Sequence, residues 1–221
     1  MGTFKKGILG GLSGKVGNVV GGNVRGTDYL RSLPTGNTNA NTILQQTQRM
    51  KFAAVINFLR PMKDIVRIGF KPEAGKLSGF NVAMSYNFHQ ALVGDYDQGF
   101  EMNYEKVLIA RGELPTIEGA TIESTVARQL DLTWEDNSVE SLAGPEDALY
   151  VGIYNADQRI GQARINPAQR AVGSASILLP ATYSGETVHC YAGFFGNQYA
   201  VAAPTAQMVA TSVYIGSLVV A

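Results

Sequence analysis

The sequence predicts an α+β protein in three parts: a glycine-rich β arm over residues 1–36, a small helical unit over 37–115, and an antiparallel β-sandwich over 116–221. Three observations support this prediction. Ten of the 25 glycines lie within the first 36 residues. Apolar residues then recur at helical spacing, and short β-rich segments separated by turn residues follow from residue 120 onward.

The arm combines glycine with residues that favour extended chain. Glycine permits positive φ and close backbone approach, whereas valine and tyrosine favour strands. We expect strand-like segments with tight bends, roughly over residues 14–20 and 23–32, closed by Pro34. Such an arm buries too little surface to be ordered alone, so we expect a neighbouring subunit or the rest of the fold to hold it. The predicted assembly residues are Gly14, Lys15, Val16, Val19, Val20, Arg25, Tyr29 and Arg31.

Three helices are predicted after the arm. The first begins near Asn41, and its apolar residues follow the i, i+3, i+4, i+7 spacing of one helix face. Pro61 suits the first position of a second short helix, which Gly69 terminates. A third helix is expected over about residues 78–93, ended by Gly94. The expected apolar faces of the first and third helices are Phe52, Val55, Ile56 and Leu59, and Phe80, Met84, Phe88, Ala91 and Leu92.

Beyond Asp95 the pattern becomes that of a β protein. Residues 100–111 are interpreted as a strand, with a boundary between 112 and 120. Further strands are expected over residues 121–134, 148–154, 174–179, 186–195 and 208–219. Short strands with turn signals between them, and no helical pattern, are typical of an antiparallel sandwich.

The net charge of zero conceals an asymmetry. Lys and Arg outnumber Asp and Glu by 12 to 3 in residues 1–76, a charge of +9. In residues 77–221 the numbers are 6 and 15, a charge of −9. A chain with opposite poles attracts its own copies head to tail, or presents its basic pole to a polyanion. The low charged fraction of 16% is expected if partners cover part of the exterior.

The sequence contains no convincing catalytic or cofactor site. The segment from Gly10 to Lys15 lacks the spacing and the hydroxyl residue of a phosphate-binding loop. His89 and His189 are far apart in sequence, and Cys190 next to His189 on a strand would face the opposite side, as a buried thiol beside an exposed imidazole. We therefore expect no enzyme activity, cofactor or metal.

Two acidic doublets, Glu135-Asp136 and Glu146-Asp147, are interpreted as solvated loop charges. The alternative is a calcium site with Asp136, Asn137 and Asp147 as oxygen donors. Most of the large aromatic residues of the sandwich are expected in its core. The best candidate ligand tip consists of Phe195, Asn197 and Tyr199, around an expected hairpin turn.

A basic face is predicted on the first two helices, consisting of Arg49, Lys51, Arg60, Lys63 and Arg67. It could contact the phosphates of a nucleic acid. Aromatic residues for base stacking are scarce, because Phe52 and Phe58 are expected in the core and only Tyr29 is a free candidate. An acidic surface on a sister subunit is therefore the preferred partner of this face.

Targeting signals are weak. The single cysteine excludes an internal disulfide, and no apolar run approaches the roughly 18 residues of a membrane span. The glycine-rich run after Lys5 and Lys6 is too short for a secretory signal, so synthesis without a Sec signal is expected. The sequence assigns no location; a virion or an extracellular assembly is compatible with it.

Six segments together identify a resemblance. They are residues 14–21 (GKVGNVVG), 29–34 (YLRSLP), 48–52 (QRMKF), 85–87 (SYN), 104–112 (YEKVLIARG) and 132–138 (LTWEDNS). In this order they resemble an uncharacterised domain family of Bacteroidota genomes and their phages. The resemblance covers nearly the whole chain and implies an N-terminal unit with helices and an immunoglobulin-like C-terminal half. It implies no activity, so it assigns no functional residue.

Three functions are compatible with the sequence. The preferred one is a non-catalytic structural subunit, virion-associated or filament-forming, that assembles with its own copies or other structural proteins through the arm. The first alternative is a cell-surface adhesion or glycan- and protein-binding module that uses the sandwich. The second is a nucleic-acid-binding packaging or scaffold protein that uses the basic face.

Overall fold

The structure is a computed structural model that describes residues 3–4, 11–24, 26–33, 41–197 and 205–221. The chain divides into two compact units, residues 1–42 and residues 43–221, and each is treated by itself. The sequence placed boundaries after residues 36 and 115. In the structure, the helices and the C-terminal strands instead belong to one unit, here called the body.

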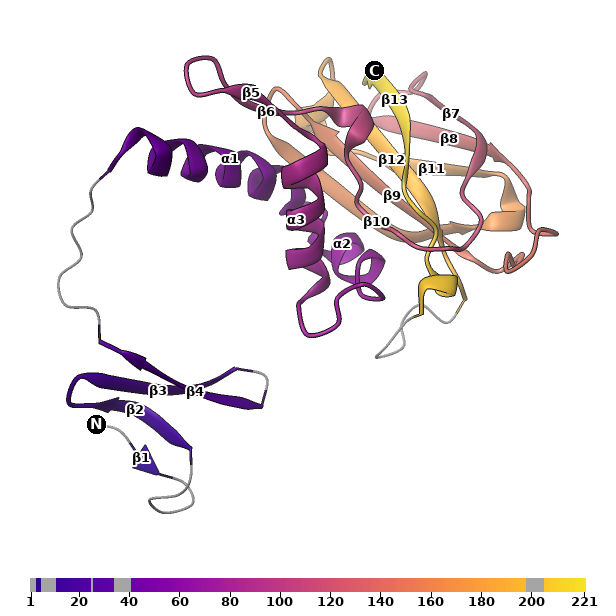
Figure 1. The fold of residues 1–221 in the computed structure, drawn as a ribbon. Helices are drawn as coiled ribbons and strands as arrows, with labels where there is room; N and C mark the ends of the chain where they lie inside the picture. Colours follow the sequence, from indigo (N-terminus) through magenta and orange to yellow (C-terminus); the bar gives the residue numbers. More distant parts are fainter. Residues whose placement is uncertain (1–2, 5–10, 25, 34–40, 198–204) are drawn as a thin grey trace. The chain divides into compact units, whose positions relative to one another are not determined.

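The N-terminal unit, here called the arm, is an antiparallel sheet (Figure 1). Its strands are β1 (Thr3–Phe4), β2 (Leu12–Val16), β3 (Val19–Val24) and β4 (Thr27–Ser32), in that spatial order. The two strand-like segments expected over residues 14–20 and 23–32 form three strands, because the chain turns at Gly17 and Asn18 and again at Gly26. Gly17 has φ +55°, a conformation that glycine adopts at little cost.

The described part of the body contains three α-helices, α1 (Ile43–Leu59), α2 (Lys63–Gly69) and α3 (Gly79–Gln90). Ser78 caps α3, since its hydroxyl accepts a 3.2 Å hydrogen bond from the Asn81 amide. The third helix ends at Gln90, earlier than predicted, because the chain continues as a hairpin of β5 (Leu92–Asp95) and β6 (Gly99–Met102). None of these helices is long and apolar enough to cross a membrane.

Two antiparallel sheets form the rest of the body. The larger has the order β10–β9–β12–β13, and the smaller has the order β11–β8–β7. Their bounds are β7 (Glu118–Glu123), β8 (Gln129–Glu135), β9 (Ala148–Asn155), β10 (Ile160–Gln169), β11 (Ser174–Leu178), β12 (Thr187–Phe195) and β13 (Val213–Val219). An apolar core between the sheets joins side chains of both, including Leu130 and Ile177 from the smaller sheet and Val151 and Phe194 from the larger.

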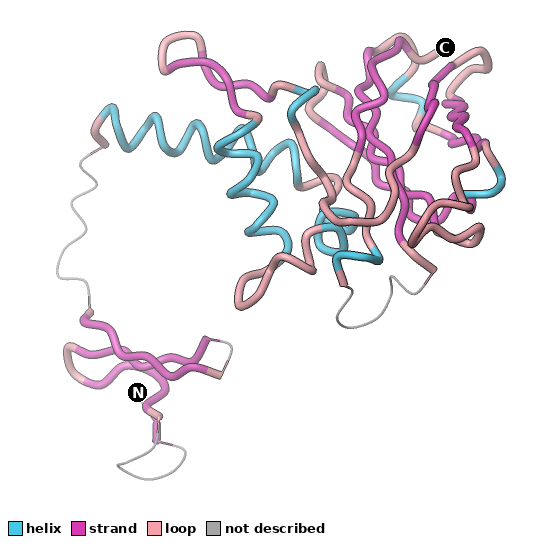
Figure 2. The backbone as a smooth tube through the Cα atoms, turned by 45° about the vertical axis from the view of Figure 1, so that its right-hand side comes forward, coloured by secondary structure: helices cyan, strands magenta, loops and turns pink. Residues whose placement is uncertain are grey.

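Strand β9 is buried along its whole length, because apolar layers cover both of its faces. Val151 and Ile153 point into the core between the sheets, whereas Tyr150 and Tyr154 contact the second core, which the helices provide. Figures 1 and 2 show the helices gathered on one side of the body's strands. The fold is therefore α+β, with mostly antiparallel strands and a helical layer on the larger sheet.

Several predicted strands differ from those observed. The segment 121–134 forms two strands, β7 and β8, and strand β10 was not predicted. The strand predicted over residues 100–111 is wrong beyond Met102. There, the buried Asn87 side chain takes the place of a neighbouring strand: its amide nitrogen donates to the Leu108 carbonyl at 2.8 Å, and its oxygen accepts from the Leu108 amide at 3.0 Å.

Candidate assembly surface

The arm sheet depends on glycines where its strands face each other. Gly21 of β3 lies opposite Leu30 of β4, and Gly22 lies opposite Tyr29. A Cβ atom on Gly21 would lie only 2.1 Å from the Leu12 carbonyl oxygen, so a larger residue does not fit there. A Cβ atom on Gly22 would meet the Tyr29 ring at 2.8–3.0 Å, which shows that this ring lies across the glycine.

The turn between β3 and β4 is held by one asparagine. The Asn23 amide nitrogen donates to the Asp28 carboxylate at 2.7 Å, and the Asn23 side-chain oxygen accepts from the Gly26 amide at 3.0 Å. Gly26 has φ +84°, which suits glycine in a tight hairpin. These contacts fix the register of the two strands.

The arm leaves most of its apolar side chains exposed. Among the described arm residues of β2, β3 and β4, only Gly21 is buried, and every residue of β4 is exposed. The exposed apolar residues are Val16 (46%), Val19 (39%), Val24 (57%), Tyr29 (42%) and Leu30 (64%). Since a small sheet without a buried core is marginal in water, this surface is one that a partner would stabilise.

The structure places seven of the eight predicted assembly residues within this one sheet. Gly14, Lys15 and Val16 lie on β2, Val19 and Val20 on β3, and Tyr29 and Arg31 on β4. Arg25 lies outside the described residues. The prediction omitted Leu30, the most exposed of the large apolar residues of the arm. Its place in a stretch that favours extended chain, next to Tyr29, was the signal that could have identified it.

The predicted basic face is divided in the body. Arg60, Lys63 and Arg67 line a hollow of about 390 Å³ together with Ile56, Ser78 and Phe80. Lys51 lies elsewhere, with its ammonium 5.1 Å from the centre of the Phe100 ring. Arg49 is exposed on α1. The structure thus reduces the basic cluster to three residues around the end of α1 and α2.

An apolar groove of about 550 Å³ runs between α1 and α3 and shares Ile56 and Phe80 with the basic hollow. Its lining also includes Phe52, which was predicted in the core but is 54% exposed. Phe52 is exposed because it lines this open groove, whereas the buried residues of α1 are Val55, Phe58 and Leu59. By contrast, the prediction that Phe58 is in the core is confirmed.

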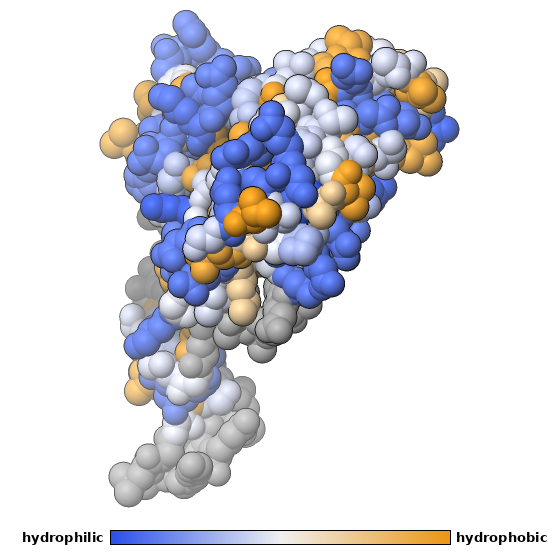
Figure 3. All heavy atoms as spheres, turned by 90° about the vertical axis from the view of Figure 1, so that its right-hand side faces the viewer, coloured by the Kyte–Doolittle hydropathy of each residue, from blue (hydrophilic) through white to orange (hydrophobic). Residues whose placement is uncertain are grey.

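The predicted ligand tip is wrong. Phe195 is fully buried, with its ring centre 4.4 Å from that of Tyr150, because β12 continues to Phe195 and pairs there with Val209. Asn197 is exposed and donates to the Glu146 carboxylate at 2.7 Å. Tyr199 lies outside the described residues. On the face shown in Figure 3, the apolar residues of the body lie scattered among hydrophilic ones.

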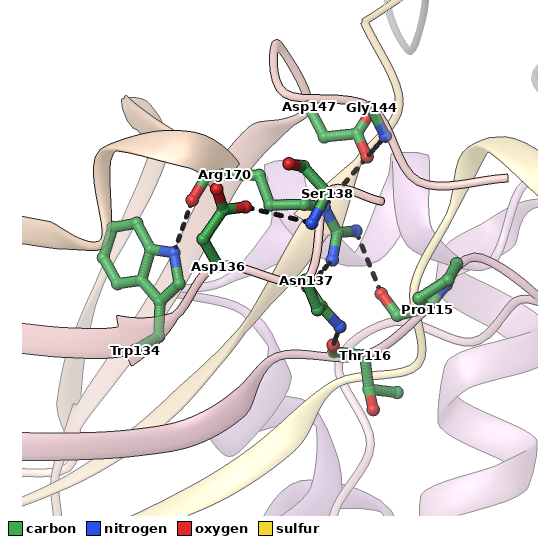
Figure 4. A network of polar contacts seen from close by, with 9 residues as sticks. All are labelled: Pro115, Thr116, Trp134, Asp136, Asn137, Ser138, Gly144, Asp147 and Arg170. Atoms are coloured by element: carbon green, nitrogen blue, oxygen red, sulfur yellow. Dashed lines mark hydrogen bonds and ion pairs between the residues drawn. The ribbon is translucent and has the colours of Figure 1, made fainter. Parts of the chain in front are cut away.

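Two of the three residues proposed as calcium ligands, Asn137 and Asp147, instead accept hydrogen bonds from a side-chain cation (Figure 4). The Arg170 guanidinium is fully buried and donates to Asp147 at 3.0 Å, to the Asn137 side chain at 2.5 Å and to the Pro115 carbonyl at 3.0 Å. The expectation that Asp147 is a solvated loop charge is therefore wrong. Asp136 stays exposed, and the hydrogen bond it accepts from the Ser138 amide lowers its pKa.

His189 and Cys190 do not form a reactive pair. His189 is half-buried rather than exposed, stacks on Tyr104 with ring centres 3.7 Å apart, and contacts the Tyr214 hydroxyl at 2.9 Å. Burial lowers the pKa of His189 and raises the pKa of Cys190 to about 12.

His89 contacts the Ser85 carbonyl on its own helix. The described residues include no group of three or more His, Cys, Asp or Glu residues placed to hold a metal.

These features define an α+β protein with an exposed arm sheet and without a recognisable reactive site among the described residues. The chain belongs to a family of unknown function (DUF6266), whose model matches residues 11–216 and so includes most of the arm and the body. No curated protein matches. Among solved structures, an fn3 domain of human contactin 1 is similar at 11% identity and TM-score 0.28, over 38% of this chain and 65% of that chain.

Proposed function

We propose that this protein is a non-catalytic structural subunit that self-assembles through its N-terminal arm. The observation that carries the proposal is the arm sheet, whose described strands expose five large apolar side chains and bury only Gly21. The family model begins at residue 11, so the arm is part of the family's domain and not an addition to it.

The mode of assembly follows from the arm's open backbone. A sheet that ends in an exposed strand accepts another strand through main-chain hydrogen bonds, and the side chains then determine which strand binds. The exposed cations Lys15 and Arg31 suit acidic surfaces on a neighbouring copy, and such charges fix orientation more than affinity.

The body is the second module of the proposed subunit. We infer that its two sheets form an immunoglobulin-like sandwich, since one sheet of three strands and one of four enclose a common core, with the order that a Greek-key arrangement requires. Sandwiches of this type serve as rigid modules in many assemblies. A virion-associated or filament-forming role is the particular use that we propose, in keeping with the resemblance to a family of Bacteroidota and their phages.

A second candidate function, nucleic-acid binding, is favoured by one observation. Arg60, Lys63 and Arg67 converge on one hollow, and three cations at one place can neutralise phosphates. Binding by this cluster would weaken steeply with salt.

The predicted ligand tip of a glycan- or protein-binding module is buried at Phe195, so we do not favour that alternative.

Light scattering of the full-length protein and of a variant lacking residues 2–33 tests the proposed function. We expect the full-length protein to form oligomers at micromolar concentration and the shortened protein to be a monomer. The body keeps both of its apolar cores in the shortened protein, so its circular dichroism and the fluorescence of Trp134, the one tryptophan in the sequence, should show a folded state. Oligomers of unchanged mass after the deletion would contradict the proposal.

A further inference from the structure

Strand β4 lies at the edge of the arm sheet among the described strands, so one side of its backbone has no strand partner there. The Leu33 amide donates to the Asn18 carbonyl at 2.7 Å, directly after the last pair of the β3–β4 ladder. Hydrogen-bonded and non-hydrogen-bonded pairs alternate along an antiparallel ladder. Odd-numbered residues of β4 therefore bond to β3, and Asp28, Leu30 and Ser32 direct their amides and carbonyls outward.

This edge lacks most of the features that usually prevent strand addition. Proteins protect exposed edges with proline, charged side chains (above all lysine), bulges or very short strands. Strand β4 carries two charged residues, Asp28 and Arg31, of opposite sign. The six residues of β4 contain no proline or lysine, pair regularly with β3, and are all exposed. Leu30, at the centre of the outward-directed residues, exposes 64% of its surface. The edge is therefore suited to receive another strand.

We propose that β4 pairs antiparallel with β4 of a second copy, about a two-fold axis at Leu30. This inference rests on the proposed function and names the surface that joins two copies. Leu30 then faces the partner's Leu30 in a hydrogen-bonded pair. The sheets of the two arms become one continuous sheet, and the contact closes on itself as an isologous dimer.

The side chains favour this register. With the axis at Leu30, Asp28 lies opposite the partner's Ser32, whose hydroxyl can donate to the carboxylate. Tyr29 lies opposite the partner's Arg31, where a guanidinium can approach an aromatic ring. Leu30 and the partner's Leu30 cover each other's apolar surface.

Two alternative registers are equally near, with their axes at Arg31 and at Tyr29. An axis at Arg31 places the guanidinium groups of the two copies opposite each other, and like charges directly opposite are destabilising. The register with its axis at Tyr29 is the stronger competitor. It also joins outward-directed residues to one another, as an antiparallel ladder requires. However, it places the carboxylate of Asp28 opposite the partner's Leu30, which offers it no hydrogen bond. It also loses the contact between Tyr29 and the partner's Arg31. The side-chain chemistry therefore selects Leu30 as the centre.

Disulfide cross-linking of the full-length chain tests the register. The Cα atoms of a hydrogen-bonded antiparallel pair are about 5.5 Å apart, within the range of a disulfide. We expect Leu30→Cys to form a covalent dimer under mild oxidation, whereas Tyr29→Cys and Ser32→Cys should remain monomeric on a non-reducing gel. Cys190 does not interfere, because it is buried and burial raises the pKa of its thiol to about 12.

A mixture of the Asp28→Cys and Ser32→Cys variants gives a second test that retains Leu30. We expect the mixture to form heterodimers, because these residues face each other across the axis, while neither variant cross-links alone. Cross-linking of Tyr29→Cys instead of Leu30→Cys would overturn the register. If light scattering shows oligomers but none of these variants or mixtures cross-links, the β4 pairing is wrong while self-assembly stands. A monomer at every concentration overturns both.

Discussion

A buried arginine illustrates how single residues hold the body together. Arg170 is surrounded by an acidic partner, an amide oxygen and a backbone carbonyl, and its guanidinium lies 4.0 Å from the centre of the Phe194 ring. Its own carbonyl accepts the Trp134 indole N–H at 2.7 Å. Burial lowers the pKa of Arg170, and the neighbouring charge of Asp147 opposes this shift. The residue thus links the two sheets to the chain segment at Pro115.

Removing Asp147 should therefore be costly. Asp147→Ala leaves a buried guanidinium without its counter-charge, and we expect a loss of about 3–5 kcal/mol in the free energy of unfolding. The matched control is Glu73→Ala, which breaks an exposed ion pair with Arg111 and should cost at most about 1 kcal/mol. Urea unfolding followed by fluorescence measures both. Equal losses in the two variants would contradict a structural role for the buried pair.

At the scale of elements, β9 determines how the layers of the body fit. It is buried on both faces, and Gly152 lies where the helical layer approaches the larger sheet. A Cβ atom at this position would lie 2.7 Å from the Ile109 side chain and 2.8 Å from the Met62 sulfur. The close approach of the Met62 and Ile109 side chains to β9 therefore depends on the missing side chain.

Gly152→Ala should displace the buried side chains of Met62 and Ile109. Overpacking of a close-packed core usually costs about 1–3 kcal/mol, and we expect a loss of that size in thermal or urea unfolding. Gly144→Ala is the control, because its nearest neighbour would be the Asp147 carboxylate at an ordinary 3.4 Å. A Gly152→Ala variant as stable as the control would show that the layers adjust freely.

Elements with local signals were predictable from the sequence. The second helix was predicted from Pro61 and Gly69; α2 begins at Lys63 rather than at Pro61, and it ends at Gly69, close to the prediction. The segment after Met102 was mispredicted because its backbone partners are side chains distant in sequence: Asn87 for Leu108 and Ser212 for Ile109. No local pattern reveals such partners.

The candidate surfaces show the same division. The strands of the arm could be predicted from composition, because valine, tyrosine and glycine act locally. The burial of Phe195 and Asp147 could not be predicted, because it depends on Tyr150 and Arg170, which lie on other strands and turns. The exposure of Phe52 likewise depends on the groove that α3, a separate helix, forms with α1.

At the scale of the whole molecule, charge follows the division into units. Residues 1–42 contain five Lys and Arg residues and one acidic residue, a charge of +4. Residues 43–221 contain 13 basic and 17 acidic residues, a charge of −4. The larger charge difference, +9 against −9, arose because the division at residue 76 counts the basic residues between 43 and 76 together with the arm. Opposite charges on arm and body favour contacts between the arm of one copy and the body of another, in addition to pairing of arms.

Sedimentation velocity of the intact chain over a range of concentrations tests the central claim most directly. The account predicts that at micromolar concentration the protein sediments with at least twice the 23.7 kDa mass of one chain, and dissociates on dilution. A single species of monomer mass at every concentration would contradict it.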